Sequence, residues 1–219
     1  MRDAVRRWAK GAVPNRILRR RVGAKGSRAV LLTFDDGPDP RLTPEVLDLL
    51  DEHGARAVFF VVGERAAGPG EEILREVLRR GHRIGNHTHT HPRPMRRGFF
   101  EYRREIRACE RAIEEATGKR PRLFRPPHGA VTPANLAAAW SLGLPTVLWG
   151  SGTGEYGHMR GRNAAAIADR FLRSVRGGDI VLMHDSCGGI PEVLRISLPR
   201  LREEGFDLAA GIDELPPMA

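Results

Sequence analysis

The feature that most constrains the fold is a regular alternation of short apolar runs with longer amphipathic segments. The apolar runs predict strands that begin near residue 29 and cover 57–62, 83–86, 122–125, 146–149, 180–183 and 207–210. The amphipathic segments predict helices from Thr43 to Gly54 and over 71–80, 99–117, 163–175 and 191–204, and another that opens at Thr132–Pro133. Alternating strands and helices are typical of a parallel α/β fold.

Two of these helices carry local signals at particular residues. Thr43 is predicted to be the N-cap of its helix, because Pro44 then takes the first helical position and Glu45 lies in the first turn. Pro199 lies inside the last helix and predicts a kink or a break there.

Polar and aromatic residues recur just past the predicted strand ends. They are Asp35, His87, Arg125, Trp149 and His184. In a parallel barrel the carboxyl ends of the strands share one face, which is where active sites are built. We therefore expect these residues to meet at that face.

The first predicted strand ends in two adjacent carboxylates, Asp35 and Asp36, followed by Gly37 and Pro38. Taken alone, this stretch favours a solvated Asp-Gly-Pro turn. Two carboxylates buried together would instead need a cation beside them.

A histidine cluster supplies ligands for such a cation. His87 and His91 are four residues apart, so both imidazoles reach one ion if the segment turns helically, whereas His89 points elsewhere. Together with Asp36 they form a two-histidine, one-carboxylate set that leaves positions open for water and substrate. An exposed histidine loop is the alternative, and the ligand types alone do not decide the metal.

Four stretches together resemble the ordered motifs of the polysaccharide deacetylases of carbohydrate esterase family 4. They are residues 33–38 (TFDDGP), 87–91 (HTHTH), 125–129 (RPPHG) and 182–185 (LMHD), and the resemblance runs from about residue 29 to 215. It implies a distorted, incomplete (β/α) barrel with the site at the strand C-terminal face. It also implies removal of acetyl groups from sugar polymers with a divalent metal, for which we favour Zn²⁺ over Co²⁺, Ni²⁺ or Mn²⁺.

The resemblance assigns the metal ligands to Asp36, His87 and His91, and the general base to Asp35. Arg125 would then keep Asp35 ionised. His184 would protonate the departing amine, and the backbone N–H of His128 would face the developing oxyanion with the metal.

Substrate contacts are expected from residues around this centre. Leu182 lies two residues before His184 on one strand, so both side chains face the same side and Leu182 suits a pocket for the acetyl methyl. Trp149, Pro127 and Tyr156 are the other expected substrate-binding residues, and Tyr156 can stack on a sugar ring.

The chain departs from the family pattern at two places. His128 replaces the usual tyrosine after the proline pair. Residues 152–156 (GTGEY) stand where the family has Asp-x-x-Asp-Trp, so Glu155 would take over the acid that orients the catalytic histidine, with one extra methylene.

We therefore expect a metal-dependent hydrolase that deacetylates an N-acetylated sugar, oligosaccharide or glycolipid. Two alternatives stay open at this point. One is a hydrolase of a small cyclic or linear amide on the same fold, and the other is a carbohydrate-binding relative without turnover.

The net charge of +9 is concentrated at the N-terminus. Residues 1–28 hold ten Lys and Arg against one Asp, while the remainder holds 26 basic and 26 acidic residues. We expect a basic arm over 1–28 and a catalytic domain over 29–219. A short apolar face that ends at Pro14 could lie on an anionic membrane surface, cap the barrel or belong to a loose tail.

Other signals address location and partners. The chain shows no apolar core of signal-peptide type and no membrane-length apolar run, and only charge suggests nucleic acid. Cys109 and Cys187 form no disulfide framework, which fits a reducing compartment. We therefore expect a cytoplasmic protein, with the arm in peripheral contact with the inner membrane face, and no nucleic-acid partner.

Overall fold

A parallel five-stranded sheet forms the centre of the protein. The computed structural model describes residues 18–24, 26–93, 98–155 and 163–219. The strand order is β4–β3–β2–β7–β6, formed by β4 (Arg83–Asn86), β3 (Ala57–Val61), β2 (Leu31–Asp35), β7 (Ile180–His184) and β6 (Ser151–Gly152).

A second, two-stranded piece continues the sheet into a distorted barrel. β1 (Leu18–Arg19) pairs in parallel with β5 (Thr146–Val147). Phe124 joins the two pieces, because it forms isolated bridges with Asn86 at the end of β4 and with Thr146 in β5. An isolated antiparallel bridge between Arg21 and Asp179 connects the segment after β1 with the residue just before β7. The expected incomplete (β/α) barrel is confirmed.

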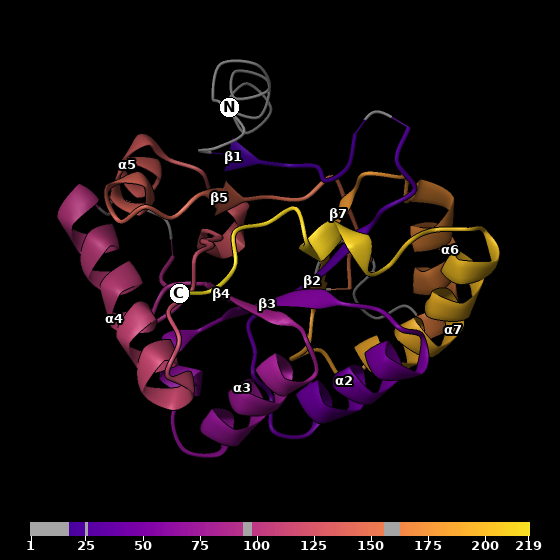
Figure 1. Ribbon diagram of the computed structural model, residues 1–219, viewed down its shortest axis with the longest axis horizontal. Helices are drawn as coiled ribbons and strands as arrows, with labels where there is room; N and C mark the ends of the chain where they lie inside the picture. Colours follow the sequence, from indigo (N-terminus) through magenta and orange to yellow (C-terminus); the bar gives the residue numbers. More distant parts are fainter. Residues whose placement is uncertain (1–17, 25, 94–97, 156–162) are drawn as a thin grey trace.

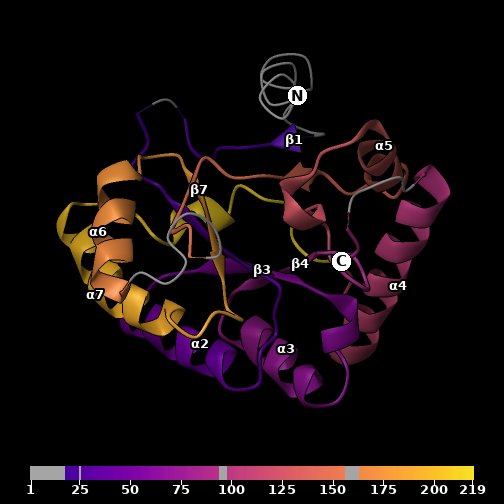
Figure 2. The ribbon, with the colours of Figure 1, turned by 180° about the vertical axis from the view of Figure 1, so that it is seen from behind.

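Helices cover the outside of the barrel. They are α2 (Leu42–Glu52), α3 (Pro69–Arg79), α4 (Phe99–Thr117), α5 (Pro133–Ser141), α6 (Ala164–Ser174) and α7 (Ile190–Glu203), with short 3-10 turns η1 (Gly63–Arg65), η2 (Pro127–Gly129) and η3 (Ala210–Ile212). Helices α4, α3, α2, α7 and α6 form an arc around the central strands, and β1 lies on the side that this arc leaves open (Figures 1 and 2).

Side chains alternate along each strand between an outer face, which packs against the helices, and an inner face, which points into the barrel. On β2, Leu32 and Phe34 point outward into the apolar cluster that packs against the helices, whereas Leu31 points into the barrel. Thr33 and Asp35 share the inward face with Leu31, since residues two apart lie on one side of a strand. Both faces of these strands are therefore buried, which explains their nearly continuous apolar sequence.

Several predicted elements are shorter than the sequence indicated. Residues 122–125 form only the bridges of Phe124, because Pro121 and Pro126 flank the segment and proline cannot donate to a ladder. Residues 146–149 are reduced to the two residues of β5. The strand predicted at 207–210 is wrong, because Asp207 forms only one bridge, to Ala29. Its carboxylate accepts hydrogen bonds from the N–H groups of Ala209 and Ala210, which folds the chain into a turn.

Helix starts and interruptions also differ from expectation. Thr43 is not an N-cap, because α2 begins at Leu42 and the Asp39 Oδ1 atom accepts hydrogen bonds from the N–H groups of Arg41 (2.9 Å) and Leu42 (3.0 Å). Pro199 does not break α7, which continues through it.

Some residues that we assigned to the N-terminal arm already pack in the barrel. Leu18 and Val22 are buried, with 3% and 2% of their surface exposed, and β1 belongs to the barrel. Arg21 forms an ion pair with Asp179 at 3.1 Å. Residues 1–17, which contain the expected apolar face of the arm, lie outside the described residues. Within the described part of the chain, no helix is both long and apolar enough to cross a membrane.

Candidate active site

Strand pairing brings the predicted residues to one edge of the barrel. Asp35 and His184 are direct partners in the register of β2 and β7, each as the last residue of its strand. His87 follows β4 directly, and its N–H donates to the carbonyl of Val61 at the end of β3. The expected meeting of these residues at the carboxyl ends of parallel strands therefore occurs.

Three side chains form a candidate metal centre. The Asp36 Oδ1 atom lies 3.1 Å from the His91 Nε2 atom and 3.4 Å from the His87 Nε2 atom. One ligand atom from each of the three residues lies within 4.8 Å of the others, so all three can reach one ion. Backbone strain accompanies this geometry, since Asp36 and His91 both have positive φ values, of 70° and 50°.

These donors fit a tetrahedral metal such as Zn²⁺. Ligand atoms held at 2.0–2.1 Å in a tetrahedron are about 3.3 Å apart, close to both separations measured here. The Nδ1–H group of His87 donates to the Arg125 carbonyl oxygen (2.8 Å), which leaves the Nε2 lone pair directed at the centre.

The charge on Asp36 also suits a cation. Burial would raise the pKa of the Asp36 carboxyl, but the close approach of the His87 and His91 imidazoles outweighs burial and holds that pKa well below its ordinary value. Its Oδ1 atom is buried and makes no well-formed hydrogen bond within the described residues. An ionised, incompletely satisfied carboxylate oxygen is thus available as a ligand.

Arg125 holds the second carboxylate in place inside the barrel. Its Nη1 atom donates to the Asp35 Oδ1 atom (2.6 Å) and to the Thr33 Oγ1 atom (2.7 Å), and its Nε atom donates to the Val147 carbonyl (3.0 Å). The guanidinium carbon lies 4.1 Å from the centre of the Phe60 ring. Burial lowers the pKa of Arg125, with Asp35 opposing, but a guanidinium stays charged and neutralises the buried Asp35.

Glu155 orients the histidine that faces Asp35. The Glu155 Oε1 atom lies 2.8 Å from the Nδ1 atom of His184, and its Oε2 atom accepts a hydrogen bond from the Thr153 hydroxyl. Burial alone would lower the pKa of His184, but the hydrogen bond that its Nδ1–H donates to Glu155, with the charges of Asp35, Glu155 and Asp36, raises it. The extra methylene of glutamate therefore still allows contact with His184.

This pairing predicts a pH effect. A raised pKa keeps His184 protonated to higher pH, so replacing Glu155 by Gln is expected to lower that pKa. The measurement is an NMR titration of the His184 ring in Glu155→Gln beside Glu192→Gln, a surface control. A His184 pKa unchanged in Glu155→Gln would contradict the pairing.

The expected substrate contacts, and His128 beside them, differ in how far they are exposed. Leu182 is partly exposed on the same side of β7 as His184, and Trp149 is partly exposed against Gly129, where any side chain would clash with the indole. His128 is exposed, with its ring centre 4.6 Å from that of His91. Pro127 is buried and presents almost no surface to a ligand, and Tyr156 lies outside the described residues.

The sequence interpretation missed a carboxylate that holds the histidine loop. The Oε2 atom of Glu105, on α4, accepts hydrogen bonds from the N–H groups of His89 (3.2 Å) and Thr90 (2.9 Å) and from the Thr90 hydroxyl (3.1 Å). A signal was present, because Glu105 interrupts the buried stripe of α4 that contains Tyr102, Ile106 and Cys109. Thr33, two residues before Asp35 on the inward face, was missed as well.

We expect Glu105→Ala to weaken Zn²⁺ binding by about 10–100-fold, as losses of outer-shell partners do at other metal sites. The reason is that the loop between His87 and His91 loses three hydrogen bonds. The measurement is a competition titration with a chelating dye. Glu115→Ala, on the exposed side of the same helix, is the control, and equal affinities in the two variants would contradict the role of Glu105.

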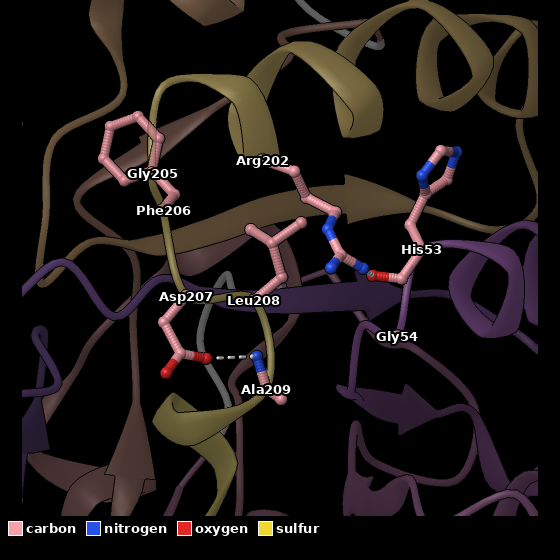
Figure 3. A pocket seen from close by; sticks show the side chains of 8 residues that line it. All are labelled: His53, Gly54, Arg202, Gly205, Phe206, Asp207, Leu208 and Ala209. Carbon is pink, nitrogen blue, oxygen red and sulfur yellow. Dashed lines mark hydrogen bonds between the residues drawn. The ribbon is translucent and has the colours of Figure 1, made fainter.

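A surface pocket lies away from this centre. It is lined by His53, Gly54, Arg202 and residues 205–209 (Figure 3). The carbonyl of Leu208 accepts the N–H of Arg56, which lies just before β3. The pocket therefore lies at the amino ends of the central strands, opposite the edge that carries Asp35 and His184.

The fold and the cluster define a (β/α)-barrel protein with a carboxylate–histidine centre at its strand ends. The sequence profile of the polysaccharide deacetylase family matches residues 23–147. A chitooligosaccharide deacetylase of Bradyrhizobium is 34% identical over 90% of this chain and 95% of its own length. The chain belongs to the polysaccharide deacetylase family.

Two further relatives add detail. The peptidoglycan-N-acetylglucosamine deacetylase PgdA of Listeria monocytogenes is 35% identical over 88% of this chain, which spans only 40% of that relative's length. Among solved structures, a CE4 family pseudoenzyme from Bacillus anthracis superposes with a TM-score of 0.80 at 25% identity, over 88% of this chain and 66% of its own. A mutant of that pseudoenzyme is described as having restored enzymatic activity.

Proposed function

We propose that this protein is a metal-dependent N-deacetylase that hydrolyses the acetamido group of N-acetylglucosamine units in a glycan. One observation carries the proposal: a candidate metal centre, the Asp35 carboxyl held by Arg125 and a His184 held by Glu155 share one edge of the barrel. The relatives named for chitooligosaccharide and for peptidoglycan N-acetylglucosamine support this substrate class.

Asp36, His87 and His91 would hold the metal, for which we propose Zn²⁺. When bound, such an ion supplies Lewis acidity to the acetyl carbonyl and lowers the pKa of a water molecule at the site.

Asp35 would act as the general base. Its Oδ1 atom is held by Arg125, whereas its Oδ2 atom lies 3.7 Å from the His87 Nε2 atom, toward the metal centre. The carboxyl is therefore fixed in position, and as the general base it would take the proton of the attacking water.

His184 would act as the general acid. With its Nδ1 atom paired to Glu155, an imidazolium would carry its other proton on Nε2. That proton passes to the amide nitrogen as the C–N bond breaks, so the amine leaves as a neutral group and acetate remains.

Leu182 and Trp149 would line the acetyl end of the site. In the sheet register, Leu182 lies between Thr33 of β2 and Gly152 of β6. Leu182 is partly exposed to solvent. An apolar, partly exposed side chain beside the proposed acid suits the acetyl methyl group.

Acetate release from N-acetylated chitooligosaccharides and from peptidoglycan fragments, with Zn²⁺ supplied, tests the proposal. We expect release from at least one glycan, accompanied by an equal amount of free amine, and release that is slower by about 10²–10⁴-fold in the Asp35→Asn variant. Binding of the glycan without release would favour a non-catalytic carbohydrate-binding protein. Turnover of small linear or cyclic amides alone would favour an amidase on the same fold.

A further inference from the structure

A buried carboxyl group next to the proposed acid has no part in this mechanism. Asp185 follows His184 directly and is fully buried. Its Oδ2 atom accepts a hydrogen bond from the Thr43 hydroxyl at 2.6 Å. Its Oδ1 atom is buried and has no hydrogen-bond partner within the described residues. A group that is costly to bury and only partly satisfied requires an explanation.

The Asp185 carboxyl lies against the turn that follows Asp36. A Cβ atom added to Gly37 would lie 2.2 Å from the Asp185 Oδ2 atom and 2.4 Å from the Oδ1 atom. Gly37 does not have a positive φ, so this position needs glycine for space rather than for backbone conformation. The carboxyl thus occupies the volume that a side chain at residue 37 would take.

Thr43 connects the same carboxyl to the far end of the turn. Its hydroxyl donates to Asp185 and accepts the N–H of Asp39 at 2.8 Å. On the other side, the Gly37 carbonyl accepts the N–H of Val62 at 3.1 Å. The turn from Asp36 to Asp39 is therefore held from β7 through Asp185 and Thr43, and from the end of β3 through Val62.

We propose that Asp185 is a positioning residue that fixes the Asp36–Asp39 turn against the end of β7 and so places Asp36 opposite His87 and His91. The metal half of this inference rests on the proposed function. Asp36 has a positive φ of 70°, a conformation that its surroundings must enforce. The register supports the link, because Asp35 and His184 are paired and Asp36 and Asp185 are the residues that follow them.

Variants of Asp185 and Thr43 test this role in the whole 219-residue chain. Asp185→Ala removes the contact with the turn and the Thr43 bond, and Thr43→Val removes the hydroxyl bridge alone. Asp185→Asn keeps an oxygen that accepts from Thr43. Asp179→Ala is the matched control, because Asp179 is a buried aspartate at the opposite end of β7.

The first readout is amide hydrogen exchange in metal-free protein. We expect the N–H of Asp39 to exchange about tenfold faster in Asp185→Ala and Thr43→Val, with little change in Asp185→Asn and Asp179→Ala. If Asp185→Ala does not fold, Thr43→Val, which loses only one hydroxyl, still decides this comparison. Unchanged exchange at Asp39 in Thr43→Val would overturn the proposal.

The second readout is the affinity for Co²⁺, with its visible spectrum as a report of ligand geometry. We expect about 10–100-fold weaker binding and an altered spectrum in Asp185→Ala, and restoration toward wild type in Asp185→Asn. A loss of Co²⁺ affinity in Asp179→Ala equal to that in Asp185→Ala would overturn the positioning role and indicate a general stability effect. A wild-type protein that binds no Co²⁺ or Zn²⁺ would overturn the proposed metal centre, while the exchange readout would still decide whether Asp185 holds the turn.

Discussion

Replacing Asp35 by Asn is expected to lower kcat/KM for deacetylation by about 10²–10⁴-fold, the usual contribution of a general base, with Zn²⁺ affinity close to wild type. The amide cannot take a proton from water, but its oxygen can still accept a hydrogen bond from Arg125. Asp36, His87 and His91 are unchanged in this variant, so the three proposed ligands are kept.

The matched variant is Asp36→Asn, which keeps the size of the adjacent side chain and removes a proposed ligand. We expect Asp36→Asn to lose both metal and activity. Acetate release and metal content measured on the same samples separate the two residues. Loss of metal to the same extent in both variants would contradict the assignment of Asp35 as base and Asp36 as ligand.

Replacing Arg125 by Met is expected to lower the free energy of unfolding by about 3–5 kcal/mol. Arg125 is fully buried and Asp35 is 4% exposed, so the substitution leaves a buried carboxylate without its cation. Chemical denaturation followed by circular dichroism gives the change in free energy.

The double variant Arg125→Met with Asp35→Asn tests the cause of this loss. Removing both charges is expected to recover much of the stability, because no unpaired ion remains. Arg200→Met is the control, because Arg200 and its carboxylate partner Asp169 are both more than half exposed, and we expect a loss of about 1 kcal/mol or less. A double variant no more stable than Arg125→Met would show that packing of the long side chain, rather than charge pairing, dominates.

The strand ends were the most predictable part of this protein. Apolar runs closed by polar residues placed Asp35, His87 and His184 at one face, and the pairing of β2 with β7 confirms that Asp35 and His184 are neighbours. Local patterns succeed here because strand direction and the two-residue period are set by the backbone itself.

Residues that depend on distant partners were not predictable. Thr43 has the local features of an N-cap, yet its hydroxyl donates a hydrogen bond to Asp185, 142 residues away in sequence. Glu105 holds the histidine loop from another element, and Leu18 enters the barrel by pairing with Thr146. Such contacts are set by tertiary packing, which overrides local propensity.

The central claim is that Asp36, His87 and His91 bind a metal on which deacetylation depends. The most direct measurement removes metal with a chelator and follows acetate release from a chitooligosaccharide while Zn²⁺ is titrated back, for wild type and for His91→Ala. We expect activity to return in wild type as one Zn²⁺ binds per chain, and to stay low in His91→Ala at the same concentrations. Full activity in the metal-free protein, or equal Zn²⁺ binding by His91→Ala, would contradict it.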